Sequence, residues 1–263
     1  MLPDKGEVSP QRGEVDVENR HSSVVMVRPY DPLNPEDDGG CGGIQIAPLL
    51  VLTAGHCVCV ARKPANLTEV ARIEPSTCAR EAIVTTVTYE PSKKVPGAAR
   101  SWTRADMGTV RPHPALQVLI GPDGSVTSSR ADLAIILLDE LEEDVTPAIV
   151  PLAETEAQKG DSILTVSYGY EESVGGAYGT RRLRRSHVLT STDERVWLDE
   201  PAGSHSQGNS GSPCLRETPR SVELLGVSSR DLGGAPTCTS IHPYRDWLRD
   251  EIQRATPKGS APP

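Results

Sequence analysis

Residues 41–57 read CGGIQIAPLLVLTAGHC, with a Cys-Gly-Gly start, a largely apolar middle at residues 44–54 and a His-Cys end. A nearly continuous apolar run of this kind predicts strands that are buried on both faces. The histidine at its end, His56, would on its own most often be a core residue with satisfied hydrogen bonds. Two stretches further along the chain change that interpretation.

The first of them, residues 131–138 (ADLAIILL), carries Asp132 at the start of an apolar run, where an unpaired carboxylate would be costly to bury. The second, residues 208–213 (GNSGSP), places Ser210 next to a glycine. Acyl transfer by a serine needs a base that takes its proton and a carboxylate that orients the base. The three contexts, in the order His56, Asp132 and Ser210, therefore predict a catalytic triad.

These segments resemble the trypsin/chymotrypsin family of serine peptidases over about residues 22–254, and the GNSGSP form resembles its bacterial members. The resemblance implies a serine endopeptidase that acts on polypeptide substrates through an acyl-enzyme. It also implies that Ser229 supports Asp132 and lines the substrate cleft. The matching segments are residues 41–57 (C-G-G…T-A-A-H-C in the family), 110–114, 132–138 (D-I-A-L-L), 166–169 (T-G-W-G), 226–229 (G-I-V-S) and 244–252.

Strand-like segments separated by Gly/Pro turns predict an all-β protein. Near the C-terminus, the spacing of Tyr244, Leu248 and Ile252 after Pro243 predicts one helix. The resemblance implies two packed six-stranded antiparallel β-barrels, followed by this helix. The predicted strands lie at residues 22–27, 44–54, 83–88, 131–138, 163–168 and 222–228.

We expect one peptidase domain over residues 21–256, with the boundary between its barrels at roughly 140–150. Residues 1–20 and 257–263 are predicted to be flexible, solvated tails because they contain little apolar surface. The first of these tails also lacks the basic start and apolar middle of a secretory signal. Either the signal has been removed or the protein stays inside the cell.

The composition excludes some partners. The chain has 263 residues, with 27 Lys and Arg against 36 Asp and Glu, and a formal net charge of −9. An acidic protein has little reason to bind phosphate backbones, so no nucleic acid partner is expected. No apolar run approaches the roughly 20 residues of a membrane span. We expect a monomer that needs no cofactor and no metal.

The six cysteines allow 15 disulfide pairings. No C-x-x-C pair supports a zinc site, and disulfides indicate a secreted or periplasmic protein. The alternative is a cytoplasmic protein with free thiols. The resemblance implies a Cys41–Cys57 bridge. Beyond the family's pattern, we expect Cys214–Cys238 near the nucleophile and Cys59–Cys78 across a surface loop.

Two departures from the family concern activation. No I-V-G-G segment occurs near residues 20–30, and Asn209 stands where the family has an aspartate that pairs with a newly cut N-terminus. A neutral amide needs no buried ammonium partner. We therefore expect an oxyanion hole, with N–H donors from Gly208 and Ser210, that forms without zymogen cleavage.

Substrate preference is left open by the sequence. Ser204 falls at the base of the specificity pocket and lacks the acid that Lys or Arg preference requires. His205 would favour an acidic substrate residue if it enters the pocket, and is otherwise a surface residue. Asp231 would restore a basic preference if it reaches the cleft. The basic run at residues 181–185 is either an exposed, self-cleaved loop or a solvated face.

Two other functions compete with an active peptidase. A catalytically silent protease homologue would act as a binding module on the same fold, but such proteins typically lose a triad residue. An esterase would use the same triad, yet the chain lacks the alternation of strands and helices of an α/β-hydrolase.

Overall fold

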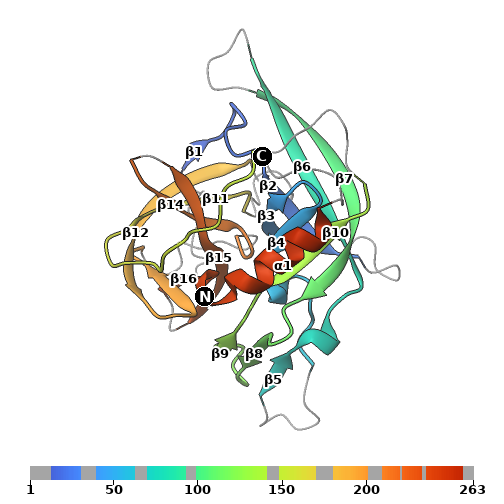
Figure 1. The fold of residues 1–263 in the computed structure, drawn as a ribbon, viewed down its shortest axis with the longest axis vertical. Helices are drawn as coiled ribbons and strands as arrows, with labels where there is room; N and C mark the ends of the chain where they lie inside the picture. Colours follow the sequence, from blue (N-terminus) through green and yellow to red (C-terminus); the bar gives the residue numbers. More distant parts are fainter. Residues whose placement is uncertain are drawn as a thin grey trace, which may run out of the picture.

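The computed structural model describes residues 13–30, 40–62, 70–92, 99–140, 148–169, 180–200, 209–219, 221–232 and 235–256. Their strands form two closed, six-stranded antiparallel β-barrels that lie side by side, with a helix packed between them (Figure 1). The predicted all-β fold with two barrels and a C-terminal helix is therefore confirmed.

The first barrel has the strand order β10-β4-β3-β2-β6-β7 and closes through pairing of β10 with β7. In β4, Leu50 and Leu52 pack into one core cluster and Val51 packs into another, because successive side chains of a strand point to opposite faces. Both faces are buried, which explains the continuous apolar run. The strands are β2 (Val24–Pro29), β3 (Cys41–Ala47), β4 (Leu50–Thr53), β6 (Glu81–Pro91), β7 (Ala99–Pro112) and β10 (Ala134–Leu138).

The second barrel has the order β12-β11-β14-β15-β16-β13 and closes through pairing of β12 with β13. The short strand β1 (Glu14–Val15) adds to β12 outside the closed ring. The barrel strands are β11 (Ser162–Ser167), β12 (Arg182–Ser191), β13 (Arg195–Leu198), β14 (Pro213–Glu217), β15 (Val222–Leu232) and β16 (Ala235–Ser240).

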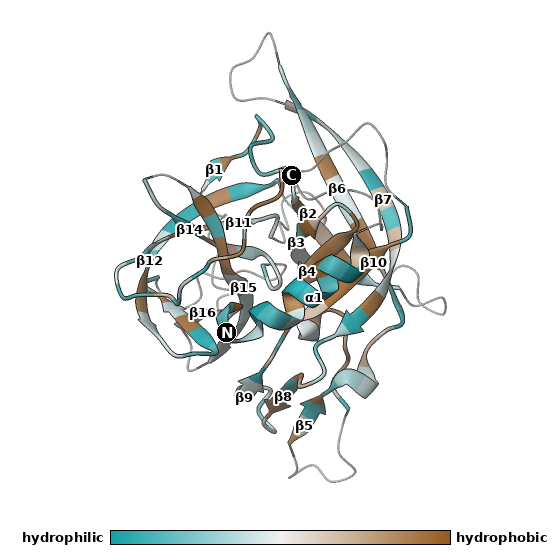
Figure 2. Ribbon diagram, viewed as in Figure 1, coloured by the Kyte–Doolittle hydropathy of each residue, from teal (hydrophilic) through white to brown (hydrophobic). Residues whose placement is uncertain are grey.

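A hydrophobic cluster joins the barrels. It contains Ile44 and Leu52 of the first barrel, Leu164 and Leu224 of the second, and Leu248 of the helix α1 (Arg245–Ala255). Figure 2 shows hydrophobic residues concentrated in the strands near the centre of the molecule, whereas the outer part of the β6–β7 hairpin is neutral to hydrophilic. The two barrels and the helix α1 therefore share one hydrophobic core.

Smaller elements complete the fold. The strands β5 (Ala71–Ile73), β8 (Gln117–Ile120) and β9 (Val126–Arg130) form a separate three-stranded sheet. Single 3-10 turns occupy Gly55–Cys57 (η1), Pro75–Thr77 (η2) and His242–Tyr244 (η4). Pro243 lies in the last of these turns, so the α-helix starts two residues later than the sequence predicts.

The prediction of a solvated tail through residue 20 needs correction for residues 13–20. β1 pairs with β12, and Asp16 is fully buried against Arg181. The ion pair makes the burial of these charges possible, and apolar content alone gives no sign of it. Residues 1–12 and 257–263 lie outside the described residues, as do residues 141–147 at the expected barrel boundary.

The basic run at residues 181–185 is not an exposed loop. Arg181 and Leu183 are buried, and β12 pairs with both β11 and β1 in this region. Arg184 and Arg185 form ion pairs with Glu200 and Glu217.

The structure contains three disulfides, Cys41–Cys57, Cys59–Cys78 and Cys214–Cys238, which are the expected pairs. All six cysteines are bonded, so none remains as a free thiol. Three disulfides fit an extracellular protein. Within the described residues, no helix has the length and apolar character needed to cross a membrane.

Candidate active site

Pairing of β4 with β10 brings His56 and Asp132 together. Thr53, the last residue of β4, lies opposite Ala134, the first residue of β10. His56 follows Thr53 by three residues and Asp132 precedes Ala134 by two, so both leave the barrel at the same end. Nδ1 of His56 lies 2.7 Å from Oδ2 of Asp132, and the backbone N–H of His56 donates to Oδ1 over 2.8 Å. The carboxylate therefore holds the histidine at two points.

The Asp132 carboxylate is buried and receives a third donor. Oγ of Ser229, on β15, donates to Oδ2 over 2.8 Å. Burial opposes ionisation of Asp132, but the nearby His56 and these hydrogen bonds outweigh it and keep the pKa of Asp132 below its ordinary value. An ionised Asp132 can only accept a hydrogen bond, so Nδ1 of His56 carries the proton and donates a hydrogen bond to Oδ2. Nε2 of the imidazole is then the atom that can take a proton from a nucleophile.

The backbone before Asp132 is strained, and a hydrogen bond to Tyr244, the residue before the helix α1, holds it in place. Ala131 has a φ of 45°, which is unfavourable for a residue with a Cβ atom. Its N–H donates to the hydroxyl of Tyr244, and its carbonyl accepts the N–H of Leu133. The Tyr244 hydroxyl in turn donates to Glu194 over 3.0 Å. These contacts fix the position from which Asp132 projects.

The loop that carries Ser210 packs against the first barrel. The N–H of Gly42, on β3, donates to the carbonyl of Ser210 over 2.7 Å. Gly211 has a φ of 79°, and a Cβ atom there would lie 2.3 Å from both the Gly42 carbonyl and Oγ1 of Thr53. Since Thr53 leads directly into the His56 turn, the Ser210 loop lies against the strand ends from which His56 projects.

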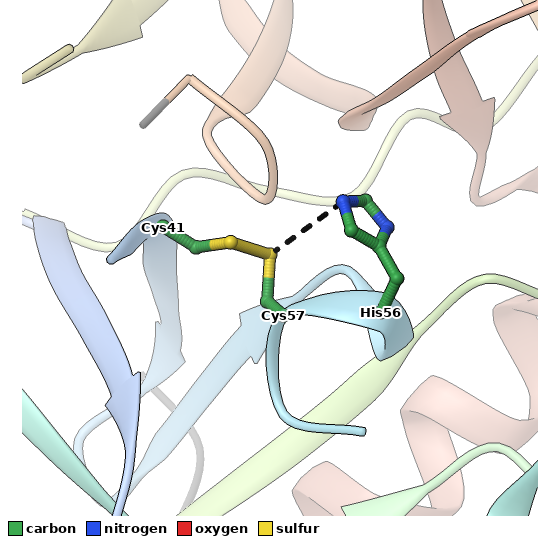
Figure 3. Close-up of side chains that lie close together, drawn as sticks. All are labelled: Cys41, His56 and Cys57. Carbon is green, nitrogen blue, oxygen red and sulfur yellow. Dashed lines mark hydrogen bonds between the residues drawn. A yellow bond between two sulfur atoms is a disulfide. The ribbon is translucent and has the colours of Figure 1, made fainter. Parts of the chain in front are cut away.

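The disulfide Cys41–Cys57 lies beside the imidazole. Sγ of Cys57 is 4.0 Å from Nε2 of His56, the contact drawn as a dashed line in Figure 3. These three side chains place potential metal-ligand atoms within 4.8 Å of one another. Both sulfurs are bonded to each other, however, and Nδ1 of His56 is engaged by Asp132. The cluster therefore has no thiolate to offer a metal ion.

Several predicted site residues are not placed. Ser204, His205 and Gly208 lie outside the described residues, and for Asp231 only the backbone, within β15, is described. The structure does place Ser229 beside Asp132.

Two contacts near the proposed triad residues have no local signal in the sequence. Gly42 belongs to the Cys-Gly-Gly motif. Its N–H donates to the carbonyl of Ser210 only because the two barrels pack together. Tyr244 was identified as an apolar helix position, and nothing local indicated that its hydroxyl reaches Ala131.

A protein-family model described as Trypsin matches residues 19–248, which is most of the chain. The matched range begins before β2 and ends within α1, so it includes both barrels and all three proposed triad positions. A search of curated proteins found no match.

Proposed function

Because the chain belongs to the trypsin family of serine peptidases, we propose that it is an endopeptidase with His56, Asp132 and Ser210 as its triad. The observation that carries the proposal is the two-point contact between His56 and the buried, ionised Asp132. This contact presents Nε2 of His56 as a base. Polypeptides are the proposed substrates, and a monomer is the proposed active form.

The reaction begins when Oγ of Ser210 attacks the peptide carbonyl and His56 takes the hydroxyl proton. The N–H groups of Gly208 and Ser210 stabilise the oxyanion of the tetrahedral intermediate. The His56 imidazolium protonates the leaving amine, and an acyl-enzyme remains. Water then attacks the ester with His56 as the base and regenerates Ser210.

This activity does not require cleavage of an N-terminal peptide. Asn209 is almost fully buried and carries no charge that would need a new N-terminal ammonium. Residues 13–21 are already held against the rest of the domain. Asp16 forms an ion pair with Arg181 and accepts hydrogen bonds from the backbone N–H groups of Arg20 and His21. A segment held in this way supports an oxyanion hole that forms in the intact chain.

Three disulfides support a secreted or periplasmic location. Ser204 supplies no acid at the base of the specificity pocket, so we propose that strict preference for Lys or Arg is absent. A peptide library would measure this preference after activity has been established.

Labelling with a fluorophosphonate probe tests the proposal on the intact chain. We expect the wild-type chain to be labelled and Ser210→Ala to remain unlabelled, because the probe reacts only with an activated serine. Ser212→Ala is a matched control: among the described residues its buried hydroxyl has no hydrogen-bond partner, so the variant should label normally. An unlabelled wild-type chain, with or without residues 1–12, would instead support a silent homologue that acts as a binding module.

A further inference from the structure

A buried arginine lies on the sheet face that supports Asp132. Arg195, at the start of β13, is only 5% exposed, and its Nη1 donates to Oγ1 of Thr237 over 2.9 Å. Thr237 lies directly opposite Ser229 in the pairing of β15 with β16. Side chains of directly opposed residues lie on the same face of a sheet. Since Ser229 donates to Asp132, the Thr237 hydroxyl and the Arg195 guanidinium share the face that supports the carboxylate.

The charge of Asp132 acts on this guanidinium. Burial lowers the pKa of Arg195, and the negative charge of Asp132 is the strongest of the interactions that oppose this change, ahead of Glu194. A guanidinium keeps its charge at all physiological pH values, even when it is partly desolvated. A fixed positive charge therefore acts on the buried carboxylate from the sheet face that carries Thr237 and Ser229.

We propose that Arg195 is a positioning residue for the triad, which stabilises ionised Asp132 and disfavours protonation of His56. The inference rests on the proposed function of the triad and names a residue that the triad itself does not include. A nearby cation favours the carboxylate and opposes a second cation on the imidazole.

Other charged and titratable groups lie near Arg195. Glu194 is its neighbour in the chain. The Glu194 carboxylate accepts a hydrogen bond from the Tyr244 hydroxyl and lies 3.6 Å from Nε of Arg130, the last residue of β9. The ring of His113 packs against Tyr244 with centroids 4.8 Å apart, and burial, together with the charge of Arg130, lowers the pKa of His113. Arg130 is mostly exposed, so solvent screens its charge more than that of Arg195.

The test compares Arg195→Met with the wild-type full chain by two readouts. NMR follows the titration of the His56 ring, and hydrolysis of a fluorogenic peptide gives the acid limb of kcat/KM. We expect both midpoints to move to higher pH by about half a unit or more in Arg195→Met. Arg195→Lys, which keeps the charge, should move them less.

Arg216→Met is the matched control, since Arg216 is another buried arginine of the second barrel, paired with Asp161 and Glu223. It should lower stability without moving either midpoint. Unchanged midpoints in folded Arg195→Met would overturn the proposal, as would an equal shift in Arg216→Met.

If Arg195→Met does not fold, Thr237→Val replaces it as the test. We expect a smaller upward shift of the midpoints in Thr237→Val, and no shift would overturn the proposal. A wild-type chain without turnover contradicts the proposed function, and the NMR titration still tests Arg195.

Discussion

Nε of Arg181 donates to Oδ2 of Asp16 over 2.8 Å, and neither side chain is exposed to solvent. The same guanidinium donates to the carbonyl of Val87 in the first barrel and to the hydroxyl of Tyr168, which follows β11 of the second. The ring of Tyr89 covers it, with the guanidinium carbon 5.1 Å from the ring centroid. One buried ion pair therefore ties the N-terminal segment to both barrels.

Asp16→Ala should leave the Arg181 charge buried without its carboxylate. We expect a loss of about 3–5 kcal/mol in the free energy of unfolding, measured by urea denaturation. Glu14→Ala removes the exposed pair with Arg20 and should cost less than about 1 kcal/mol. Equal losses in the two variants would show that burial of the Asp16 pair adds nothing to its strength.

Gly211→Ala should damage both stability and activity, because the new Cβ atom would collide with the Gly42 carbonyl at a positive φ. We expect a cost of about 2 kcal/mol or more and a drop in kcat/KM of at least about tenfold. Gly124→Ala is the control, since its φ of 82° is similar but no atom lies within 4 Å. Similar effects on stability in both variants would mean that φ alone matters and the contact with Gly42 does not.

Ser229→Ala removes one donor to the buried Asp132 carboxylate. A hydrogen bond to a charged group contributes about 1.5–3 kcal/mol, so kcat should fall by roughly 10- to 100-fold. Steady-state kinetics separate this effect from substrate binding. A rise in KM with unchanged kcat would place the function of Ser229 in the cleft and not in the support of Asp132.

Acid should weaken the fold partly through Asp132. Its folded-state pKa lies below the unfolded value of about 3.9, so the unfolded chain binds more protons in the interval between the two. The stability that this carboxylate contributes is present above about pH 5 and is lost as the pH falls through the folded pKa. Urea unfolding of Asp132→Asn between about pH 3 and 6 should show a flatter dependence than the wild-type chain; identical slopes would contradict this.

Asn209→Asp would place a carboxylate at a position that is 3% exposed, next to the proposed nucleophile Ser210. Without a free N-terminal ammonium to neutralise it, the charge should distort the Ser210 loop, and we expect activity to fall by at least about tenfold. Asn209→Ser adds no charge and should keep more activity. Full activity of Asn209→Asp in a peptidase assay would remove the argument for activation without cleavage.

Much of the fold could be predicted from neighbouring residues. The continuous apolar runs in β4 and β10 reflect strands that are buried on both faces, and the spacing of Tyr244, Leu248 and Ile252 reflects one face of a helix on the shared core. The Cys-Gly-Gly, Ala-Gly-His-Cys and Gly-Asn-Ser-Gly motifs identified the family. In each case the information lies within a few residues along the chain. The short strands β5, β8 and β9 have no such pattern and were not predicted.

Which charged side chains are buried, and against which partners, was decided only by the tertiary structure. Arg181 is one of four arginines in a basic run, and it is buried because Asp16, 165 positions away in the chain, lies against it. Arg195 shares a sheet face with Ser229, the donor to Asp132, only because β13, β16 and β15 are neighbours in a closed barrel. The sequence by itself determined the family, because the motifs around His56, Asp132 and Ser210 are local patterns. The partners of each buried charge depend on which distant segments the barrels bring together.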